Sequence, residues 1–283
     1  MKLWDRDQLP DLPPLKLAVV GHCEWVNFVE VDAMPQPGRV GHARQHLEEP
    51  AGGGAVIAVQ LARLLGQPVR LFTALGRDSI GQQTVERLRQ LGVEPLVAWR
   101  DQPSRRGISF VDAAADRAIT VIGERLTPTA ADPLPWQELA SCDGVFVTAA
   151  DAPALQLARR ARLLAATPRV RLSVLEQSAV VLDALIGSGL DPAEQVPSGA
   201  LSSEPRLRIA TAGADGGVVW PGGVYRAARL PEPMRDAYGC GDSFAAGVMA
   251  ALAAGWSVEQ AVSLGCHCGA ACALRFGPYG GDS

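Results

Sequence analysis

The sequence contains no long uninterrupted hydrophobic run, and this absence argues against a membrane-spanning helix. Such a helix needs about 20 consecutive apolar residues, and no stretch of the 283 residues reaches that length. The opening residues 1–5 also lack the apolar core of a secretory signal peptide. We therefore expect a cytoplasmic protein that makes no contact with a membrane.

The sequence also lacks a concentration of charge of one sign. Its formal net charge is −4, and the basic residues are dispersed apart from small clusters such as Arg105–Arg106 and Arg159–Arg160. This distribution does not indicate a nucleic-acid-binding surface. Low-complexity tracts are absent as well, and 48% of the residues are hydrophobic, which is typical of a chain that folds around an apolar core.

The cysteines also lack the spacing that is typical of a disulfide framework. The six cysteines stand in apolar or helical settings, which agrees with a reducing compartment. Cys266-His267-Cys268 and Cys272 could suggest a zinc site. However, two thiols two positions apart on one helix point to different faces, and structural zinc sites usually use Cys-x₂₋₄-Cys spacing. Packing of small buried residues is the favoured interpretation.

Strand-like and helix-like segments alternate along the chain. Strands are predicted at residues 15–21, 69–74, 144–148, 171–175, 207–211 and 217–220. Helices are predicted at residues 55–65, 80–91, 154–166, 179–186, 244–254 and 258–274. This alternation favours an α/β fold with a mostly parallel central sheet and helices on both of its faces.

Three segments do not follow this alternation. Residues 25–31 and 107–121 alternate apolar and polar side chains, which predicts antiparallel strands half exposed to water. Residues 1–14 carry charges and three prolines, and we predict that they form a mobile N-terminal arm. The length by itself allows one domain or two.

The segment Asp236-Ala237-Tyr238-Gly239-Cys240-Gly241-Asp242-Ser243-Phe244 carries the most information about function. Two glycines directly precede an acid and an Ala-rich apolar run, which predicts a tight turn that opens a helix. The free N–H groups of a first helical turn can bind an anion. A carboxylate at the mouth of such a site suggests a base that takes a proton from a hydroxyl attacking a phosphate. The alternative is a helix that Asp242 merely caps.

The segment resembles the Asp-Thr-Thr-Gly-Ala-Gly-Asp-x-Phe signature of the ribokinase-like (PfkB) carbohydrate kinases. Four further stretches resemble family motifs in the family's order, and the likeness extends over residues 15 to 277. These stretches are Val31-Asp32-Ala33-Met34-Pro35-Gln36-Pro37-Gly38, Ala51-Gly52-Gly53-Gly54-Ala55, Gly76-Arg77-Asp78-Ser79-Ile80-Gly81 and Thr211-Ala212-Gly213-Ala214-Asp215-Gly216.

The resemblance implies a fold and an assembly. The expected fold is α/β, a ribokinase-like three-layer α/β/α domain over residues 15–283 with a mostly parallel central sheet. A small β lid from about residues 24–50 and 104–123 would cover the sugar pocket. Because such lids often form a dimer interface in the family, we expect a possible homodimer through the lid.

The resemblance also implies a reaction, the ATP- and Mg²⁺-dependent transfer of a phosphoryl group to a hydroxyl of a sugar or sugar-like molecule. Asp242 would be the general base, and the amides of Gly239, Cys240 and Gly241 would form the anion hole.

The remaining motif residues would hold the cofactors. Thr211, Gly213 and Gly216 would approach the nucleotide, and the alternative for this loop is a hairpin turn with no ligand. The loop of Asp236 would help to hold a monovalent cation such as K⁺, and the alternative for Asp236 is an ordinary turn residue.

The sequence departs from the family where the acceptor would bind. Gly52, Gly53 and Gly54 match the substrate loop, but Glu24 and Val26 replace the Asn and Asp that follow the family's first strand. Val56 replaces the Asn that follows the glycines. Losing two polar contacts makes an ordinary furanose a less favoured substrate, and Glu24, His22, Trp25 or Asn27 could supply other contacts.

The family's Asn-x-x-Glu motif, which handles Mg²⁺, is also incomplete. Its nearest equivalent contains Asp191 and Glu194, which we name as candidate metal-handling residues. Each of them could equally be an ordinary polar loop residue.

Three other functions are considered. One is a nucleoside or vitamin-alcohol kinase of the same fold, and another is a catalytically weak, nucleotide-binding regulatory protein. A dinucleotide-dependent enzyme is disfavoured, because no Gly-x-Gly-x-x-Gly follows the first strand.

Overall fold

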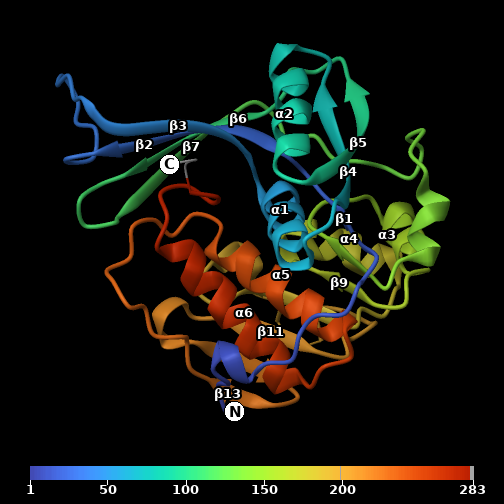
Figure 1. Cartoon of the computed structure of the whole chain (residues 1–283). Coiled ribbons are helices and arrows are strands. Elements are labelled where there is room, and N and C mark those ends of the chain that lie inside the picture. The colour runs from blue at the N-terminus through green and yellow to red at the C-terminus, as the bar shows by residue number, and fades with distance from the viewer. Residues whose placement is uncertain (198, 281–283) are drawn as a thin grey trace.

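A computed structural model describes residues 1–197 and 199–280, and Figure 1 shows the arrangement of their elements. Within these residues a nine-stranded sheet has the order β13-β12-β11-β10-β9-β8-β1-β4-β5. Its strands are β1 (Leu17–Val20), β4 (Val69–Gly76), β5 (Val93–Arg100), β8 (Gly144–Val147), β9 (Leu164–Ala166), β10 (Ala184–Ser188), β11 (Arg208–Thr211), β12 (Gly217–Trp220) and β13 (Gly223–Tyr225). Only the pairs β11–β12 and β12–β13 are antiparallel, which confirms the predicted, mostly parallel sheet.

Helices cover both faces of this sheet and complete three layers. They are α1 (Gly53–Leu65), α2 (Ser79–Gln90), α3 (Ala152–Ala158), α4 (Leu172–Ser178), α5 (Cys240–Ala253) and α6 (Val258–Ala273). Alternate residues of a strand point to opposite faces. In β1, Leu17 and Val19 therefore join the core with α1, α5 and α6, whereas Ala18 and Val20 join the core with α3 and α4.

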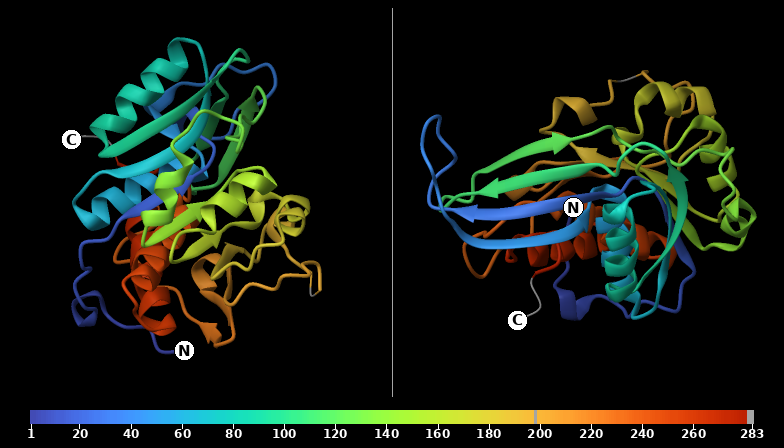
Figure 2. Two further views of the ribbon diagram at one scale, coloured as in Figure 1. Left: turned by 90° about the vertical axis from the view of Figure 1, so that its right-hand side faces the viewer. Right: turned by 90° about the horizontal axis from the view of Figure 1, so that it is seen from above.

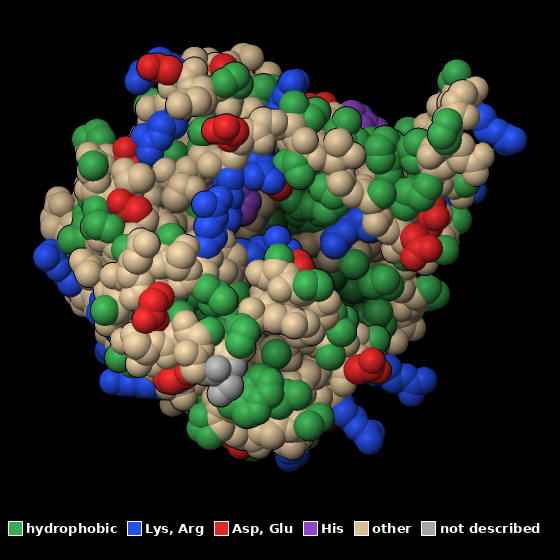
Figure 3. Space-filling model, turned by 180° about the vertical axis from the view of Figure 1, so that it is seen from behind, with side chains coloured by type: hydrophobic (Ala, Val, Ile, Leu, Met, Phe, Trp, Pro, Cys, Tyr) green, Lys and Arg blue, Asp and Glu red, His purple; other side chains and the backbone are tan. Residues whose placement is uncertain are grey.

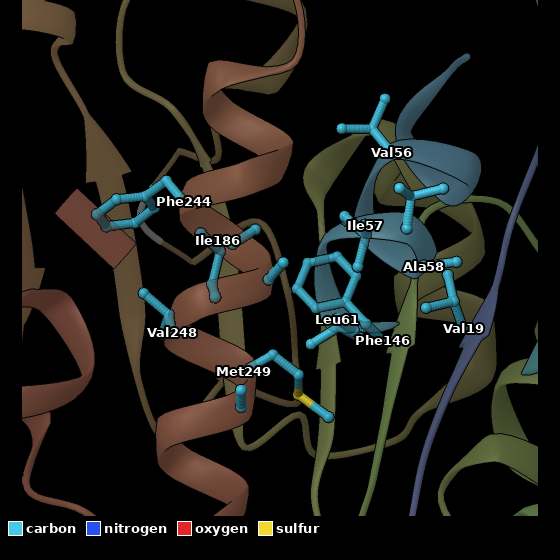
Figure 4. Close-up of a cluster of buried hydrophobic side chains, with 14 of the residues drawn as sticks. Val19, Val56, Ile57, Ala58, Leu61, Phe146, Ile186, Phe244, Val248 and Met249 are labelled. Atoms are coloured by element: carbon cyan, nitrogen blue, oxygen red, sulfur yellow. The ribbon is translucent and has the colours of Figure 1, made fainter. Parts of the chain in front are cut away.

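The larger core lies where α1 and α5 meet the middle of the sheet (Figure 4). Ile57 and Leu61 of α1 and Met249 of α5 have no exposed surface, and they pack with Phe146 of β8 in one cluster. This core fixes the two helices side by side. Their N-terminal ends lie together at the carboxyl edge of β1.

A second sheet projects from the body, as Figures 1 and 2 show. It has the order β3-β2-β6-β7, with β2 (Glu24–Val31), β3 (Ala43–Ala51), β6 (Arg106–Val111) and β7 (Arg117–Ile122). We call this sheet the lid, and its strands fall in the two predicted segments. The outer pairs are antiparallel as predicted, but β2 and β6 pair in parallel.

The edge strand of the lid exposes apolar side chains. Ile119, Val121 and Ile122 of β7 are 41–44% exposed. An exposed strand edge of this kind favours pairing with another chain, so the homodimer through the lid stays a prediction.

The predictions for residues 154–188 are wrong in three places. The predicted helix 154–166 is α3 followed by the buried strand β9, and the predicted strand 171–175 lies mostly in α4. The predicted helix 179–186 is a connecting segment over residues 179–183 followed by the start of β10. These runs are short and rich in Ala, Leu and Val. A short, fully buried strand has no alternating pattern, so periodicity cannot separate it from a buried helix. The edge strand β5 was not predicted.

Residues 1–14 lie along α6 rather than away from the domain. The amide of Trp4 donates to Ser263 Oγ over 2.9 Å, His267 bonds the carbonyl of Trp4 at 2.8 Å, and Leu9 is buried. These contacts place the segment against α6, and the mobility that the prolines and charges predict stays a prediction. The predicted domain limit of 283 lies outside the described residues.

The helices among residues 1–197 and 199–280 include none with the length and hydropathy required to cross a bilayer.

The central position of α1 gives a first testable prediction. We expect Leu61→Ala to lower the free energy of unfolding by about 2–5 kcal/mol, because Leu61 has no exposed surface and its removal leaves a cavity. Urea denaturation followed by circular dichroism measures the change. The matched control is Leu190→Ala, whose side chain is 68% exposed and whose loss should change stability by no more than about 0.5 kcal/mol. Equal effects of the two substitutions would contradict the described core.

Candidate active site

The N-terminus of α1 lies close to Asp242 of α5 and to the loop of His22, and glycines make this approach possible. A Cβ atom on Gly53 would lie 3.0 Å from Asp242 Oδ1, and one on Gly54 would lie 2.6 Å from the carbonyl oxygen of His22. Gly52 has a φ of 81°, which favours glycine. The structure thus brings the predicted residues Gly52, Gly53, Gly54 and Asp242 together at the end of β1.

The first turn of α5 has open amides. Gly239 precedes the helix with a φ of 78°, and a Cβ on Gly241 would meet no atom within 4 Å. Among the described residues, the amides of Gly239, Gly241 and Asp242 have no hydrogen-bond partner, whereas Cys240 N–H donates to Ala237 O over 3.3 Å. Free amides at a helix N-terminus are suited to an anion. The open amides therefore include two of the three that we predicted, those of Gly239 and Gly241, together with that of Asp242.

The Cys240 thiol is kept from reacting by its surroundings. A hydrogen bond with Cys272 and burial raise its pKa, so the thiol stays protonated at neutral pH.

The carboxylate of Asp242 lies free at this junction. It makes no hydrogen bond with any residue in the described part of the chain. Desolvation and then the nearby Glu194 carboxylate raise its pKa to about 6, against the opposing effect of Arg169 and Arg117. A carboxylate with a pKa near neutrality is a suitable general base.

A cavity of about 630 Å³ opens on the other side of the α5 N-terminus. The predicted nucleotide residues Thr211, Gly213 and Gly216 line it together with Cys240 and Gly241. Gly216 has a φ of 94°, and a Cβ there would lie 2.1 Å from Tyr225 O, so the loop can turn only with glycine. The cavity and the open amides are therefore continuous.

Asp236 is buried and joins two loops. Its carboxylate accepts hydrogen bonds from the amide of Tyr238 over 2.8 Å and from the amide of Gly277 over 3.1 Å. Burial nevertheless raises its pKa. This side chain holds the start of the motif against the C-terminal loop and does not line the cavity.

Residues of the lid also lie near Asp242. Glu24 of β2 is buried, forms an ion pair with Arg105 at 2.8 Å and accepts a hydrogen bond from the Tyr238 hydroxyl over 3.3 Å. Val26 and Val56 have no exposed surface, so their side chains serve as apolar packing inside the protein.

Four positively charged side chains stand around the same region. Arg105 and Arg117 come from the lid, Arg125 from the segment after β7, and Arg169 from the segment after β9. Figure 3 shows basic side chains gathered with a histidine around a hollow beside the projecting lid. Apart from Arg105, these arginines were not singled out from the sequence. They are far apart along the chain, and Arg169 follows a strand that was predicted to be a helix.

The predicted metal-handling residues both contact an arginine. Asp191 and Glu194 each lie 2.5 Å from a nitrogen of Arg169, and Glu194 also accepts from the amide of Ser188 over 2.8 Å. Among residues 1–197 and 199–280, His, Cys, Asp and Glu side chains do not gather in a group of three or more placed to hold a metal ion. The two carboxylates are therefore better explained as partners of Arg169 than as ligands of a metal ion held by the protein alone. We call this arrangement, in which Arg169 pairs with both Asp191 and Glu194, the Arg169 clamp.

Comparison with known proteins agrees with this geometry. A ribokinase from Dictyostelium discoideum is 31% identical over 109 residues, and the match spans 38% of this chain but only 34% of that protein's length. Among solved structures, a putative ribokinase from Agrobacterium tumefaciens gives a TM-score of 0.78 at 18% identity over 95% of this chain and 94% of that one. Ribokinase from Arabidopsis thaliana, solved with ribose and ATP, gives a TM-score of 0.72 at 16% identity over 94% of each chain.

These structural likenesses establish the ribokinase fold. The sequence model described as the pfkB family carbohydrate kinase matches residues 14–282, almost the whole chain. The chain belongs to the pfkB family of carbohydrate kinases.

Proposed function

We propose that the protein transfers the γ-phosphoryl group of ATP to a hydroxyl of a sugar or sugar-like small molecule, with Asp242 as the general base. One observation carries the proposal. An unbonded carboxylate, whose pKa is raised to about 6, lies between open amides on one side and the Gly52–Gly54 turn on the other. Phosphoryl transfer depends mainly on such positioning and on stabilising negative charge.

The cavity of about 630 Å³ is the proposed nucleotide site. The loop of Thr211, Gly213 and Gly216 and the Ala-rich face of α6 give it a mostly apolar lining, which suits a base and a sugar. Its inner end reaches Gly241, where the open amides would receive the terminal phosphates. The solved ribokinase relative bound to ribose and ATP supports this assignment.

In the proposed reaction the acceptor hydroxyl donates its proton to Asp242. The hydroxyl oxygen forms a bond to the γ-phosphorus as the bond to the β–γ bridging oxygen breaks, and ADP leaves. The amides of Gly239, Gly241 and Asp242 would stabilise the charge that develops on the transferred group. Mg²⁺ would neutralise phosphate charge, but the Arg169 clamp occupies Asp191 and Glu194, so we assign no step to a protein-held metal. The loop of Asp236 remains the proposed site for a monovalent cation.

A nucleoside acceptor is the second candidate. A solved nucleoside kinase from Methanocaldococcus jannaschii shares the fold with a TM-score of 0.66 at 15% identity. The buried Val26 and Val56 also leave fewer groups for the hydroxyls of a free sugar. Turnover of nucleosides compared with sugars would separate the two candidates.

The role of Asp242 gives the second testable prediction. Asp242→Asn keeps the shape of the side chain but cannot accept the proton, so we expect kcat to fall by about 10²- to 10⁴-fold while the fold is kept. ADP release is measured with Mg·ATP across sugars, polyols and nucleosides, and circular dichroism checks folding. The exposed Asp101→Asn is the matched control and should retain full activity. A fully active Asp242→Asn enzyme would remove Asp242 from this role.

The pKa of Asp242 gives the third prediction. The base works only when it is ionised, so kcat/KM should rise about tenfold per pH unit below pH 6 and level off above it. The profile is measured with the best acceptor between pH 4.5 and 8.5. Residual activity of Asp242→Asn should lack this inflection, and an unchanged inflection in that variant would assign the titration to another group.

The nucleotide cavity gives the fourth prediction. Ala270 of α6 lines the cavity, whereas its neighbour Ala271 is exposed. We expect Ala270→Phe to fill part of the cavity and raise the Kd for ATP about tenfold or more, equivalent to at least about 1.4 kcal/mol. Isothermal titration calorimetry measures the Kd. Ala271→Phe adds the same ring outside the cavity and should bind ATP normally; similar losses in both variants would place the nucleotide elsewhere.

A further inference from the structure

Near Asp242, two of the four arginines described above lack a carboxylate partner among residues 1–197 and 199–280. Glu24 is paired with Arg105, and both Asp191 and Glu194 are paired with Arg169. Within the described residues, Arg125 and Arg117 have no carboxylate partner. Asp242 is thus the one acid near these arginines that is left unpaired in this part of the chain.

Arg125 is held in place entirely by neutral acceptors. Its guanidinium donates to the carbonyl oxygens of Thr148 over 2.7 Å and Arg169 over 2.8 Å, and to His22 Nδ1 at 3.0 Å. Its Nε is buried and has no partner. A desolvated charge without a counter-ion is costly, and the neighbouring guanidinium groups of Arg105 and Arg169 add to this cost.

The surroundings keep Arg125 charged and His22 neutral at pH 7. Burial, followed by Arg105, Arg169 and Arg171, lowers the pKa of Arg125 to about 10, which is still well above neutrality. Burial, followed by Arg125, Arg105 and Arg169, lowers the pKa of His22 well below its usual value. Because Nδ1 of neutral His22 accepts from Arg125, its proton lies on Nε2. That nitrogen faces Gly52, where a Cβ would lie 2.8 Å from it.

The position of this cluster separates it from the nucleotide. None of Arg105, Arg125 and His22 lines the cavity that contains Thr211 and Gly241. The cluster instead adjoins the N-terminus of α1. Asp242 lies close to Gly53, His22 lies close to the preceding Gly52, and Arg125 is hydrogen-bonded to His22. Arg105 reaches the same place from the start of β6 through its ion pair with Glu24. The guanidinium of Arg125, which has no carboxylate partner among the described residues, therefore lies on the side of Asp242 away from that cavity.

We propose that the acceptor is a polyhydroxylated molecule that carries an anionic group, a carboxylate or a phosphate, which binds to Arg125 and Arg105. This inference rests on the proposed kinase function and narrows its substrate class. The anion supplies the counter-ion that Arg125 lacks, and the Nε2–H of His22 offers a further donor. Charged contacts take the place of the hydroxyl contacts that the buried Val26 and Val56 cannot make.

The test compares acceptors that differ only in charge. ADP release is measured with neutral aldoses, with the corresponding aldonic acids and with the corresponding sugar phosphates. We expect at least one anionic form to exceed its neutral counterpart in kcat/KM by about 10- to 100-fold, which is the range that charge-assisted hydrogen bonds give. The acid and the phosphate arms identify which anionic group is recognised. A neutral acceptor that is used as well as its acid and its phosphate would overturn the inference and leave the kinase function intact.

Variants at Arg125 test the same point. Arg125→Met should remove the preference by raising KM for the anionic acceptor about 10- to 100-fold, with little change in KM for the neutral one. Arg125→Lys keeps the charge and should restore part of the preference. The exposed Arg160→Met is the matched control and should behave as wild type. Equal losses for neutral and anionic acceptors in Arg125→Met would indicate a structural role and contradict the inference.

A binding measurement decides the question even where no acceptor of the panel is turned over. Binding of inorganic phosphate is titrated by calorimetry into protein saturated with a non-hydrolysable ATP analogue. Wild type should bind phosphate at least about tenfold more tightly than Arg125→Met, and equal binding would overturn the inference. Failure of the ATP analogue itself to bind would instead contradict the proposed kinase function.

Discussion

The structure depends on the close approach of the N-terminal ends of α1 and α5, which lie side by side, at the carboxyl edge of β1. Gly54 leaves no room for a side chain, because a Cβ there would lie 2.6 Å from the backbone carbonyl oxygen of His22. A Cβ on Gly53 would lie 3.0 Å from Asp242 Oδ1, so a side chain there would displace this carboxylate. The approach is maintained from behind by the packed core of Ile57, Leu61 and Met249. Since each helix N-terminus carries partial positive charge, their convergence favours a region in which negative charge is stabilised.

The electrostatics of this region balance opposing demands on one carboxylate. Desolvation and Glu194 push the pKa of Asp242 up, and Arg169 and Arg117 pull it down, so that it is raised only to about 6. A lower pKa would make Asp242 a weak base, and a much higher one would leave it protonated at neutral pH. Arg169 takes part twice, because it also holds Asp191 and Glu194. The incomplete Asn-x-x-Glu motif is thus part of an arginine clamp next to the base, which the sequence pattern does not reveal.

Much of the fold, but less of the site, could be predicted from the sequence. The strands β1, β4, β8, β11 and β12 and the helices α1, α2, α5 and α6 were predicted because each has an apolar pattern of sufficient length or adjoins a glycine motif. The prediction failed for the segment from α3 to β10 because its elements of three to seven residues are too short to show a readable period. In the site, Asp242 and the glycines stand in contiguous motifs and could be predicted. Arg117, Arg125 and Arg169 come from three separate segments, and only tertiary structure brings their charges together.

Tyr238 connects the two halves of the site. It stands inside the glycine motif, yet its hydroxyl donates to Glu24 of the lid over 3.3 Å and accepts from the amide of Gly52 over 3.2 Å. Its ring packs edge-on against Phe28 of β2 with centroids 4.8 Å apart, and Arg117 of β7 lies 5.6 Å from its centroid. Burial raises the pKa of this hydroxyl further above its usual value, so it remains a neutral donor. The same residue therefore contacts the lid, the α1 turn and the loop that opens α5. Through Tyr238 the lid has a direct physical connection to the first turn of α5, where the open amides lie.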